Sequence, residues 1–172
     1  MSQTPFSTIL TALAEAGIRL VVIGGVAVVL DGRVRATQDI DLVVDFDPSN
    51  IARLLETLAA HQFAPVADVD PNGLCDPRTR EIWLQEYGMD VLRFTLAQPA
   101  SIQIDVFVQP PLPFDRLWAN ASSASLGEGR LRYAGLADLM ESKRLAGRPV
   151  DLNDISELER LIELTRYLKD TP

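Results

Sequence analysis

The sequence predicts a mixed α/β (α+β) domain, in which a mixed β-sheet is flanked by helices and followed by a helical C-terminal portion. Three observations support this prediction. Segments 39–46 and 101–108 alternate apolar and polar residues at the two-residue period of a strand. Segments 5–16 and 48–58 carry apolar residues at helical spacing. After the run Pro110-Pro111-Leu112-Pro113, the pattern becomes mainly helical.

The first half of the chain is expected to alternate helix and strand. Thr4 caps a helix with Pro5 at its first position, and Gly17 ends it. A buried strand at 19–23 then runs directly into Gly24-Gly25. The next segments are a short helix or turn at 26–30, the strand at 39–46 and a helix opened by Pro48, Ser49 and Asn50.

The second half begins with an irregular stretch. Residues 63–76 are rich in Pro, Asp, Asn and Gly and are expected to be a loop, and Asp76 caps a helix at 77–87. Strands at about 90–96 and 101–108 should form an antiparallel hairpin. A short helix at 114–119, a small strand at 131–133 and helices at 135–146 and 152–169 follow. We therefore divide the chain into a core, 1–110, and a helical portion, 111–172, packed on it.

Composition excludes several classes of function. The 172 residues contain no run of 18 apolar residues, so no membrane partner is expected, and the N-terminus lacks the features of a secretion signal. Cys75 is the only cysteine and reads as a neutral free thiol, which suits a cytoplasmic location. His61 is the only histidine, which argues against histidine catalysis and His-rich zinc binding. With a net charge of −8, the chain can hold a nucleic acid only through a local basic patch.

Carboxylates mark the polar side of both clear strands. Asp39 and Asp41 are two positions apart, so they project from one face with Cα atoms roughly 6.6 Å apart. Asp105 is the lone charge within a second, strongly apolar strand. If these strands are neighbours, the three carboxylates converge, and such a group can hold one or two Mg²⁺ ions for attack on phosphorus. The alternative is a set of solvent-facing aspartates on an edge strand.

Other residues near these strands suit phosphate binding. Gly24-Gly25 ends a strand and opens a helix, where glycine lets backbone N–H groups approach an anion. Arg33 and Arg35 lie between this turn and the aspartates, and either neutralises phosphate or is a solvated loop charge. Lys143 lies in an apolar helical stripe with Leu136, Leu139 and Met140, so it either needs an anion or extends to solvent.

The run VIGGVAVVLDGRVRATQDIDLVV, with IQIDVFV some sixty residues later, resembles the nucleotidyltransferase superfamily that includes DNA polymerase β. The matching positions are Ile23-Gly24-Gly25, Asp39-Ile40-Asp41-Leu42 and Ile104-Asp105-Val106. The Gly-Gly turn, the R-x-T-x-D-I-D-L stretch and a late lysine look most like AbiEii/MenT-type toxins and related small bacterial nucleotidyltransferases. The resemblance covers about residues 18–108.

This resemblance implies Mg²⁺ (or Mn²⁺) as cofactor and a nucleoside triphosphate, such as ATP, as donor. Asp39, Asp41 and Asp105 would bind metal, and Asp105 would also act as base toward the acceptor. The donor would be held by residues that match or adjoin the motifs: Gly24, Gly25, Arg35, Thr37, Lys143 and Asp154. Asp154 matches an aspartate of the toxins, although a capping role beside Asp151 competes with this role.

Three functions remain open at the level of sequence. The first is a toxin of a toxin–antitoxin system that transfers a nucleoside monophosphate to a tRNA 3′ end, with a cognate antitoxin as partner. A basic patch for tRNA would draw on Arg78, Arg80, Arg130, Arg132, Lys143, Arg144 and Arg148. The second is an aminoglycoside or lincosamide nucleotidyltransferase, because an acidic surface suits a cationic drug. The third is a regulatory nucleotidyltransferase that modifies a partner protein.

Overall fold

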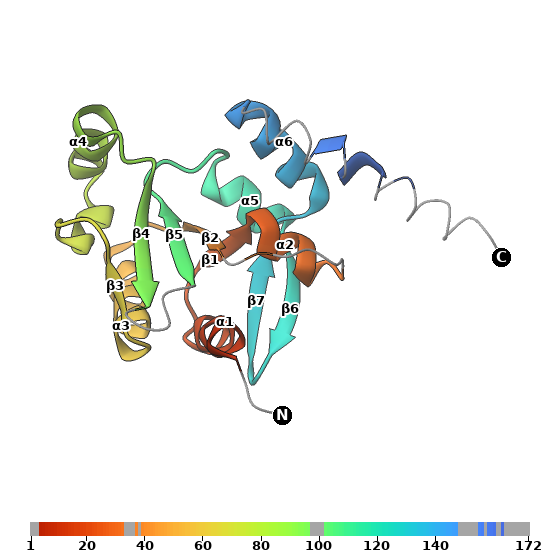
Figure 1. Ribbon diagram of the computed structural model, residues 1–172, viewed down its shortest axis with the longest axis horizontal. Coiled ribbons are helices and arrows are strands. Elements are labelled where there is room, and N and C mark those ends of the chain that lie inside the picture. Colours follow the sequence, from red (N-terminus) through yellow and green to blue (C-terminus); the bar gives the residue numbers. More distant parts are fainter. Residues whose placement is uncertain are drawn as a thin grey trace.

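The computed structural model describes residues 4–32, 37, 39–96, 102–147, 155–156, 158–160 and 163. Within these residues, seven strands form one mixed sheet in the order β3-β4-β5-β2-β1-β7-β6, with helices around it (Figure 1). The strands are β1 (Leu20–Ile23), β2 (Asp39–Val44), β3 (Phe63–Pro65), β4 (Val91–Leu96), β5 (Gln103–Phe107), β6 (Ser122–Leu126) and β7 (Gly129–Tyr133). The predicted mixed sheet is confirmed.

Two helices begin at the capping residues that the sequence indicates. The helices are α1 (Pro5–Glu15), α2 (Gly24–Leu30), α3 (Pro48–Ala60), α4 (Pro77–Tyr87), α5 (Phe114–Asn120) and α6 (Leu136–Ala146), with a 3₁₀ helix η1 (Pro71–Cys75). The Thr4 side chain accepts a hydrogen bond from the Ser7 N–H, and Asp76 accepts from the N–H groups of Arg78 and Thr79. The predicted starts of α1 and α4 are therefore confirmed.

The centre of the sheet is built from β1, β2 and β5. Strand β2 runs antiparallel to β1 and parallel to β5, and Asp41 is the register partner of both Ile23 and Asp105. Strand β4 pairs antiparallel with β5, which confirms the predicted hairpin. Residues Ile40, Leu42, Ile104 and Val106 are fully buried on these strands. This apolar core holds the polar ends of the strands at fixed spacing.

A buried asparagine ties the sheet to α3. The Asn50 Nδ2 donates to the carbonyl oxygens of Arg19 and Asp45, at 3.0 and 2.8 Å, and its Oδ1 accepts from the Arg19 N–H at 2.7 Å. Asn50 is only 1% exposed. The Asp45 N–H still donates to the Arg19 carbonyl oxygen, and the Asn50 side chain bridges the Arg19 N–H and the Asp45 carbonyl oxygen, where β1 begins and β2 has ended.

The structure differs from the predictions in two segments. The stretch 63–76, predicted to be a loop, contains β3 and η1, because three residues from Phe63 to Pro65 pair with the edge of β4. Strand β6 was not predicted; its residues are small and polar, and pairing with β7 rather than intrinsic preference makes it a strand. The small strand predicted at 131–133 is part of β7.

The division of the chain at residue 110 stays a prediction. Strands β6 and β7 join the main sheet from beyond that position. The helix predicted at 152–169 falls largely outside the described residues, of which 155–156, 158–160 and 163 are helical. No helix in the described part of the chain is long and apolar enough to cross a membrane.

Candidate functional site

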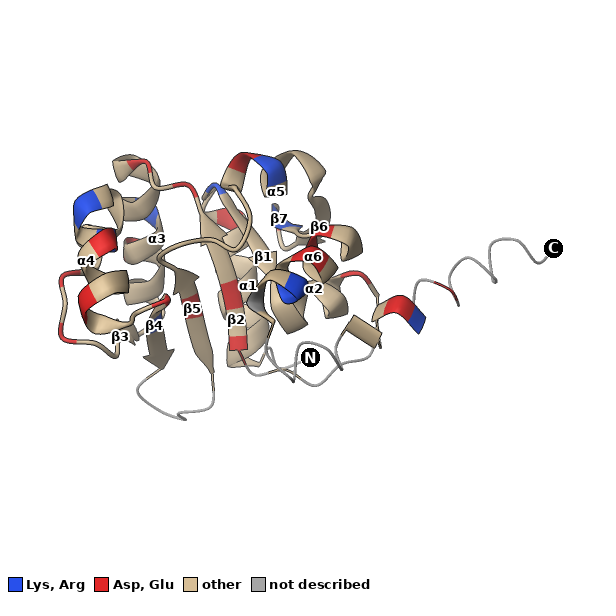
Figure 2. Cartoon of the chain, turned by 90° about the horizontal axis from the view of Figure 1, so that it is seen from above, with Lys and Arg blue, Asp and Glu red and all other residues tan. Residues whose placement is uncertain are grey.

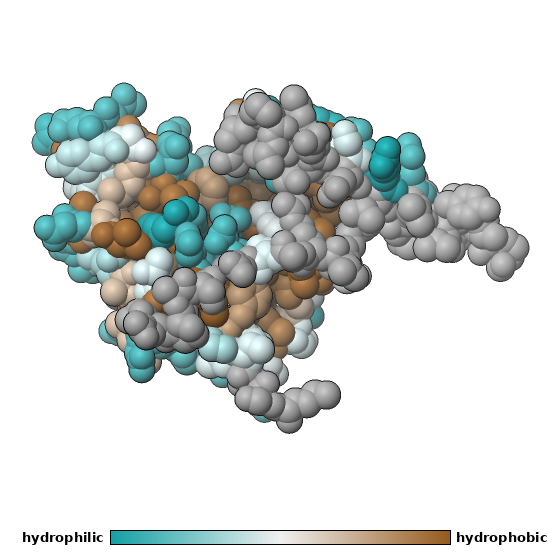
Figure 3. Space-filling model, in the orientation of Figure 1, coloured by the Kyte–Doolittle hydropathy of each residue, from teal (hydrophilic) through white to brown (hydrophobic). Residues whose placement is uncertain are grey.

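A cavity of about 670 Å³ opens where β1 ends beside β2 and β5. Its lining includes Gly24, Asp41, Arg93, Asp105 and Lys143, so residues from both halves of the chain meet there. In Figure 3, hydrophilic residues emerge among hydrophobic ones over β4 and β5, on the face turned to the reader. The volume falls in the range of ligand sites that hold small molecules of nucleotide size.

The three aspartates predicted to bind metal lie on two adjacent strands. Figure 2 shows acidic bands side by side on β2 and β5. Asp41 and Asp105 are direct register partners, so their Cα atoms are one strand spacing apart, about 4.8 Å. Asp39 precedes Asp41 by two residues on the same face and is exposed, whereas Asp105 is only 6% exposed. Asp41 and Asp105 line the cavity.

Gly24 is required by the position of Asp41. Its φ of +68° lies in the left-handed region, which favours glycine. A Cβ atom at this position would lie 3.0 Å from Cγ of Asp41 and closer still to Oδ2. The Asp41 carboxylate therefore lies directly against the backbone where α2 begins, and the absence of a side chain at Gly24 makes room for it.

Arg93 binds Asp105 from the next strand. Arg93 and Asp105 are register partners across β4 and β5. The Arg93 Nε and Nη2 donate to the two Asp105 oxygens, each at 2.7 Å. These hydrogen bonds raise the pKa of Arg93, and the charges of Asp39 and Asp41 add to the effect. The arginine thus supplies a countercharge to Asp105, next to the strand that carries Asp39 and Asp41.

Lys143 reaches the cavity from α6, on which Leu139 and Ser142 also line it. This helix is anchored by Asp138, which is 4% exposed and accepts from Arg116 Nη2 at 2.8 Å. Arg116 also pairs with Glu141, one turn along α6, and the pKa of Glu141 is lowered mainly by this hydrogen bond. The α5–α6 contact therefore sets where Lys143 meets the strands.

Of the other residues predicted to bind the nucleoside triphosphate, the structure describes Gly25 and Thr37. Gly25 is the second residue of α2 and is half-buried. The Thr37 hydroxyl donates to the carbonyl oxygen of Asp39 at 3.1 Å. Arg35 and Asp154 lie outside the described residues, as do Arg33 and Asp151. Their predicted contacts with phosphate stay predictions.

The carboxylates have the chemistry that Mg²⁺ requires, since hard divalent cations take oxygen ligands. Within the described part of the chain, however, no three His, Cys, Asp or Glu side chains gather closely enough to form a metal-binding group. Arg93 occupies one position on each Asp105 oxygen. A carboxylate offers about four acceptor positions. Asp41 and Asp105 therefore fit a cation, provided that the side chains adjust around it.

Sequence reasoning missed two charged residues of the cavity, Arg93 and Asp90. Arg93 is the only charged residue of β4 and stands between the buried Leu92 and Phe94. This pattern mirrors that of Asp105, so the pair could have been found once the hairpin register was known. By contrast, the expectation for Cys75 agrees with the structure, because burial raises the pKa of its thiol above 9.0.

The fold was compared with known proteins. No protein-family model matches the sequence, and no curated protein matches it significantly. The structure is similar to the crystal structure of an antigenic nucleotidyltransferase-like protein from Paracoccidioides brasiliensis, with a TM-score of 0.56 and 18% sequence identity. The match covers 94% of this chain and 78% of the other. At this identity the likeness concerns the fold, and the chain has a nucleotidyltransferase-like fold.

Proposed function

We propose that the chain is a metal-dependent nucleotidyltransferase, which moves a nucleoside monophosphate from a nucleoside triphosphate to an acceptor hydroxyl and releases pyrophosphate. The observation that carries the proposal is the register of Asp41 with Asp105, beside Gly24 and within a cavity that Lys143 also lines. The nucleotidyltransferase-like fold supports it further.

Each residue then has a distinct task. Gly24 makes room for the Asp41 carboxylate, and with Gly25 it would bring backbone N–H groups at the start of α2 close to a phosphate. Lys143 contributes positive charge to the triphosphate from α6. Asp105, oriented by its two hydrogen bonds from Arg93, accepts the proton of the attacking hydroxyl. Because these groups are held by a rigid sheet, donor and acceptor can be aligned for in-line attack.

Asp39, Asp41 and Asp105 would hold Mg²⁺ (or Mn²⁺). When bound, the ion supplies charge stabilisation at the reacting phosphate and the leaving group. Asp41 contributes to this site through a carboxylate that already lies against the Gly24 backbone. Asp39 is exposed at the beginning of β2, so its carboxylate is accessible to a bound nucleotide.

For the acceptor, we propose the tRNA 3′ end, with the chain as the toxin of a toxin–antitoxin system in the cytoplasm. This follows the resemblance to AbiEii/MenT-type proteins in the R-x-T-x-D-I-D-L stretch and in Lys143. A local basic surface is compatible with this acceptor despite the net charge of −8, since Arg130 and Arg132 lie near each other on β7.

A second candidate, nucleotidylation of a cationic antibiotic, is favoured by the cavity itself. Asp90 lines it together with Asp41 and Asp105, and Asp90 is exposed. An acidic mouth would attract an aminoglycoside more strongly than an RNA backbone. The acceptor hydroxyl would then belong to a small molecule, with the donor chemistry unchanged.

The test is an incubation of the full chain with Mg²⁺ and each labelled nucleoside triphosphate. Separate reactions contain total tRNA, an aminoglycoside or the product of the neighbouring gene. Label on tRNA supports the toxin, label on the drug supports the resistance enzyme, and label on the protein supports a regulator. The Asp41→Asn variant should lose transfer by at least roughly a hundredfold, while Asp68→Asn, an exposed aspartate away from the cavity, should retain it.

If Asp41→Asn transfers as fast as the wild type to every acceptor, the proposed metal site is wrong. If the folded parent chain labels no acceptor under any condition, nucleotidyl transfer itself is contradicted. Pyrophosphate release should be measured in parallel, because it reports transfer to an acceptor that was not recovered.

A further inference from the structure

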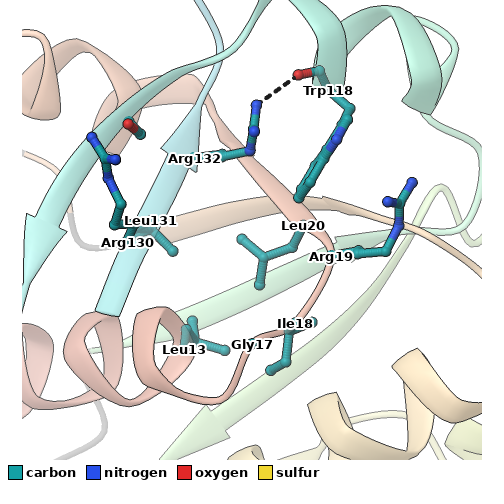
Figure 4. Close-up of a pocket in the computed structure, with 10 residues that line it drawn as sticks. Leu13, Gly17, Ile18, Arg19, Leu20, Trp118, Arg130, Leu131 and Arg132 are labelled. Atoms are coloured by element: carbon teal, nitrogen blue, oxygen red, sulfur yellow. Dashed lines mark hydrogen bonds between the residues drawn. The ribbon is translucent and has the colours of Figure 1, made fainter. Parts of the chain in front are cut away.

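A second cavity, of about 250 Å³, lies at the opposite end of β1 from Gly24. It is lined by Arg19, Arg130, Arg132, Trp118 and Ser123, among others (Figure 4). The four residues of β1 lie between Arg19 and Gly24, so the Cα atoms of these two residues are roughly 16 Å apart. This cavity is therefore distinct from the one that holds Asp41 and Asp105.

Trp118 holds two of the arginines in place. The guanidinium carbon of Arg132 lies 4.1 Å from the centre of the Trp118 ring, and that of Arg19 lies 4.8 Å from it. Figure 4 shows the ring between the two side chains. Arg132 Nη1 also donates to the Trp118 carbonyl oxygen at 3.0 Å. Both guanidinium groups are thus positioned before any ligand binds, which lowers the entropy lost on binding.

The third arginine comes from the strand pattern of β7. Arg130 and Arg132 alternate with the buried Leu131 and Tyr133, so both project from the same face of the sheet. Across the hairpin, their register partners on β6 are the hydroxyl residues Ser125 and Ser123. Arg130 is exposed and makes no hydrogen bond or ion pair with any residue in the described part of the chain.

The charges around this cavity are unbalanced. The chain has 24 acidic and 16 basic residues, yet the described lining of the cavity contains three arginines and no acid. Asp45 partly neutralises the positive charge. Its carboxylate accepts a hydrogen bond from Arg19 Nε at 2.8 Å and another from the Asp47 N–H. The one carboxylate shown to pair with these arginines therefore neutralises Arg19 alone, and an anion would balance the charge of Arg130 and Arg132.

We propose that this cavity is a second anion site, which binds a phosphate group. Guanidinium groups bind phosphate oxygens through paired, charge-assisted hydrogen bonds, and the Ser123 hydroxyl can donate another. The volume holds a phosphate with part of an attached sugar, not a whole nucleotide with its base. Because Arg19, Arg132 and the Phe114 ring already pack against the Trp118 ring, no base stacks there. The site recognises phosphate and not nucleotide sequence.

The fluorescence of Trp118 can be used to measure ligand binding in this cavity. The chain contains two tryptophans, Trp83 and Trp118, so Trp83→Phe leaves Trp118 as the only one. Its fluorescence is followed in full-length protein without metal as each ligand is added. Inorganic phosphate and pyrophosphate represent a free anion, whereas a short single-stranded oligonucleotide without terminal phosphates represents a phosphodiester backbone.

We expect at least one of these ligands to change the fluorescence of Trp118. Arg130→Gln should weaken that binding roughly tenfold, because it removes one charge-assisted contact. Arg130 is exposed, so this change should leave the thermal midpoint unaltered. Arg53→Gln is the matched control, since Arg53 is equally exposed but lies on α3. Its binding should match that of the parent.

The pattern across ligands identifies the source of the phosphate. Binding of free phosphate or pyrophosphate indicates a small anionic ligand, and binding of the oligonucleotide alone indicates a nucleic-acid strand. If none of the three changes the fluorescence, or if Arg130→Gln binds as tightly as the parent, the proposal is overturned. Asp41→Asn should keep this binding, so the result does not depend on nucleotidyl transfer.

Discussion

Arg93 on β4 holds both carboxylate oxygens of Asp105 on β5, through hydrogen bonds of 2.7 Å from Nε and Nη2. The Asp105 side chain is 9% exposed and that of Arg93 is 46% exposed, so the pair lies at the boundary between core and cavity. Because Asp41 is the partner of Asp105 on the other side, one arginine and two carboxylates occupy three consecutive strands of the sheet.

Replacement of Arg93 tests whether it neutralises the charge of the Asp105 carboxylate. Arg93→Ala should lower the free energy of unfolding by about 1–2 kcal/mol without metal, since a buried carboxylate loses its partner but Arg93 itself is partly solvated. Mg²⁺ should then raise the melting temperature of the variant more than that of the wild type, because it replaces the missing charge. Thermal unfolding with and without Mg²⁺ measures both effects.

The control for Arg93 is Arg144→Ala. Arg144 pairs with Glu159 at 3.2 Å, and both side chains are more than half exposed. This change should alter stability by less than about 0.5 kcal/mol and leave the Mg²⁺ shift unchanged. Equal Mg²⁺ shifts in Arg93→Ala and wild type would contradict a shared role of Arg93 and metal at Asp105.

Gly24→Ala should disrupt the site through a direct clash. The new Cβ would meet the Asp41 carboxylate, and the positive φ adds backbone strain. We expect a loss of about 2–4 kcal/mol in unfolding free energy and a loss of any transfer activity. Gly88→Ala separates the two causes, because Gly88 has φ +59° but nothing within 4 Å of a new Cβ. It should cost only about 1–2 kcal/mol, as measured by urea unfolding; equal costs would exclude the clash.

Lys143→Ala should raise the KM for the nucleoside triphosphate about tenfold, with a smaller change in kcat, if the lysine mainly binds the donor. Steady-state kinetics at varied donor concentration checks this. Arg144→Ala is again the neighbour for comparison, because its side chain does not line the cavity. An unchanged KM in Lys143→Ala would contradict a role of the lysine in binding the nucleoside triphosphate.

The cap of α3 predicts a pH dependence of stability. Hydrogen bonds from the Ser49 side chain and N–H lower the pKa of Asp47 below 3.8. The folded pKa is then below that of the unfolded chain, so this stabilisation is present above about pH 4 and is lost as the pH falls through the lowered value. Asp47→Asn keeps a cap but cannot titrate.

Urea unfolding between about pH 5 and pH 2 should therefore show a steeper loss of stability in the wild type than in Asp47→Asn. The two curves should run parallel above about pH 5, where Asp47 stays ionised. Parallel curves throughout the acid range would mean that Asp47 has the same pKa in the folded and unfolded chain.

The sequence by itself determined the local elements and the residue types of the candidate site. Thr4 and Asp76 cap helices where expected, and the alternation in 39–46 and 101–108 assigns Asp39, Asp41 and Asp105 to strand faces. These properties follow from neighbours within a few residues, so the chain need not be folded to reveal them.

Apart from the predicted pairing of β4 with β5, tertiary structure alone decided which strands are neighbours. The contacts that set Asp41 beside Asp105, Arg93 against Asp105 and Asn50 against Arg19 join residues that are 12 or more positions apart. Tertiary structure likewise made a strand of the polar segment Ser122–Leu126 and brought three arginines and Trp118 to one cavity. Such contacts depend on pairing and burial across the whole sheet, which no local pattern specifies.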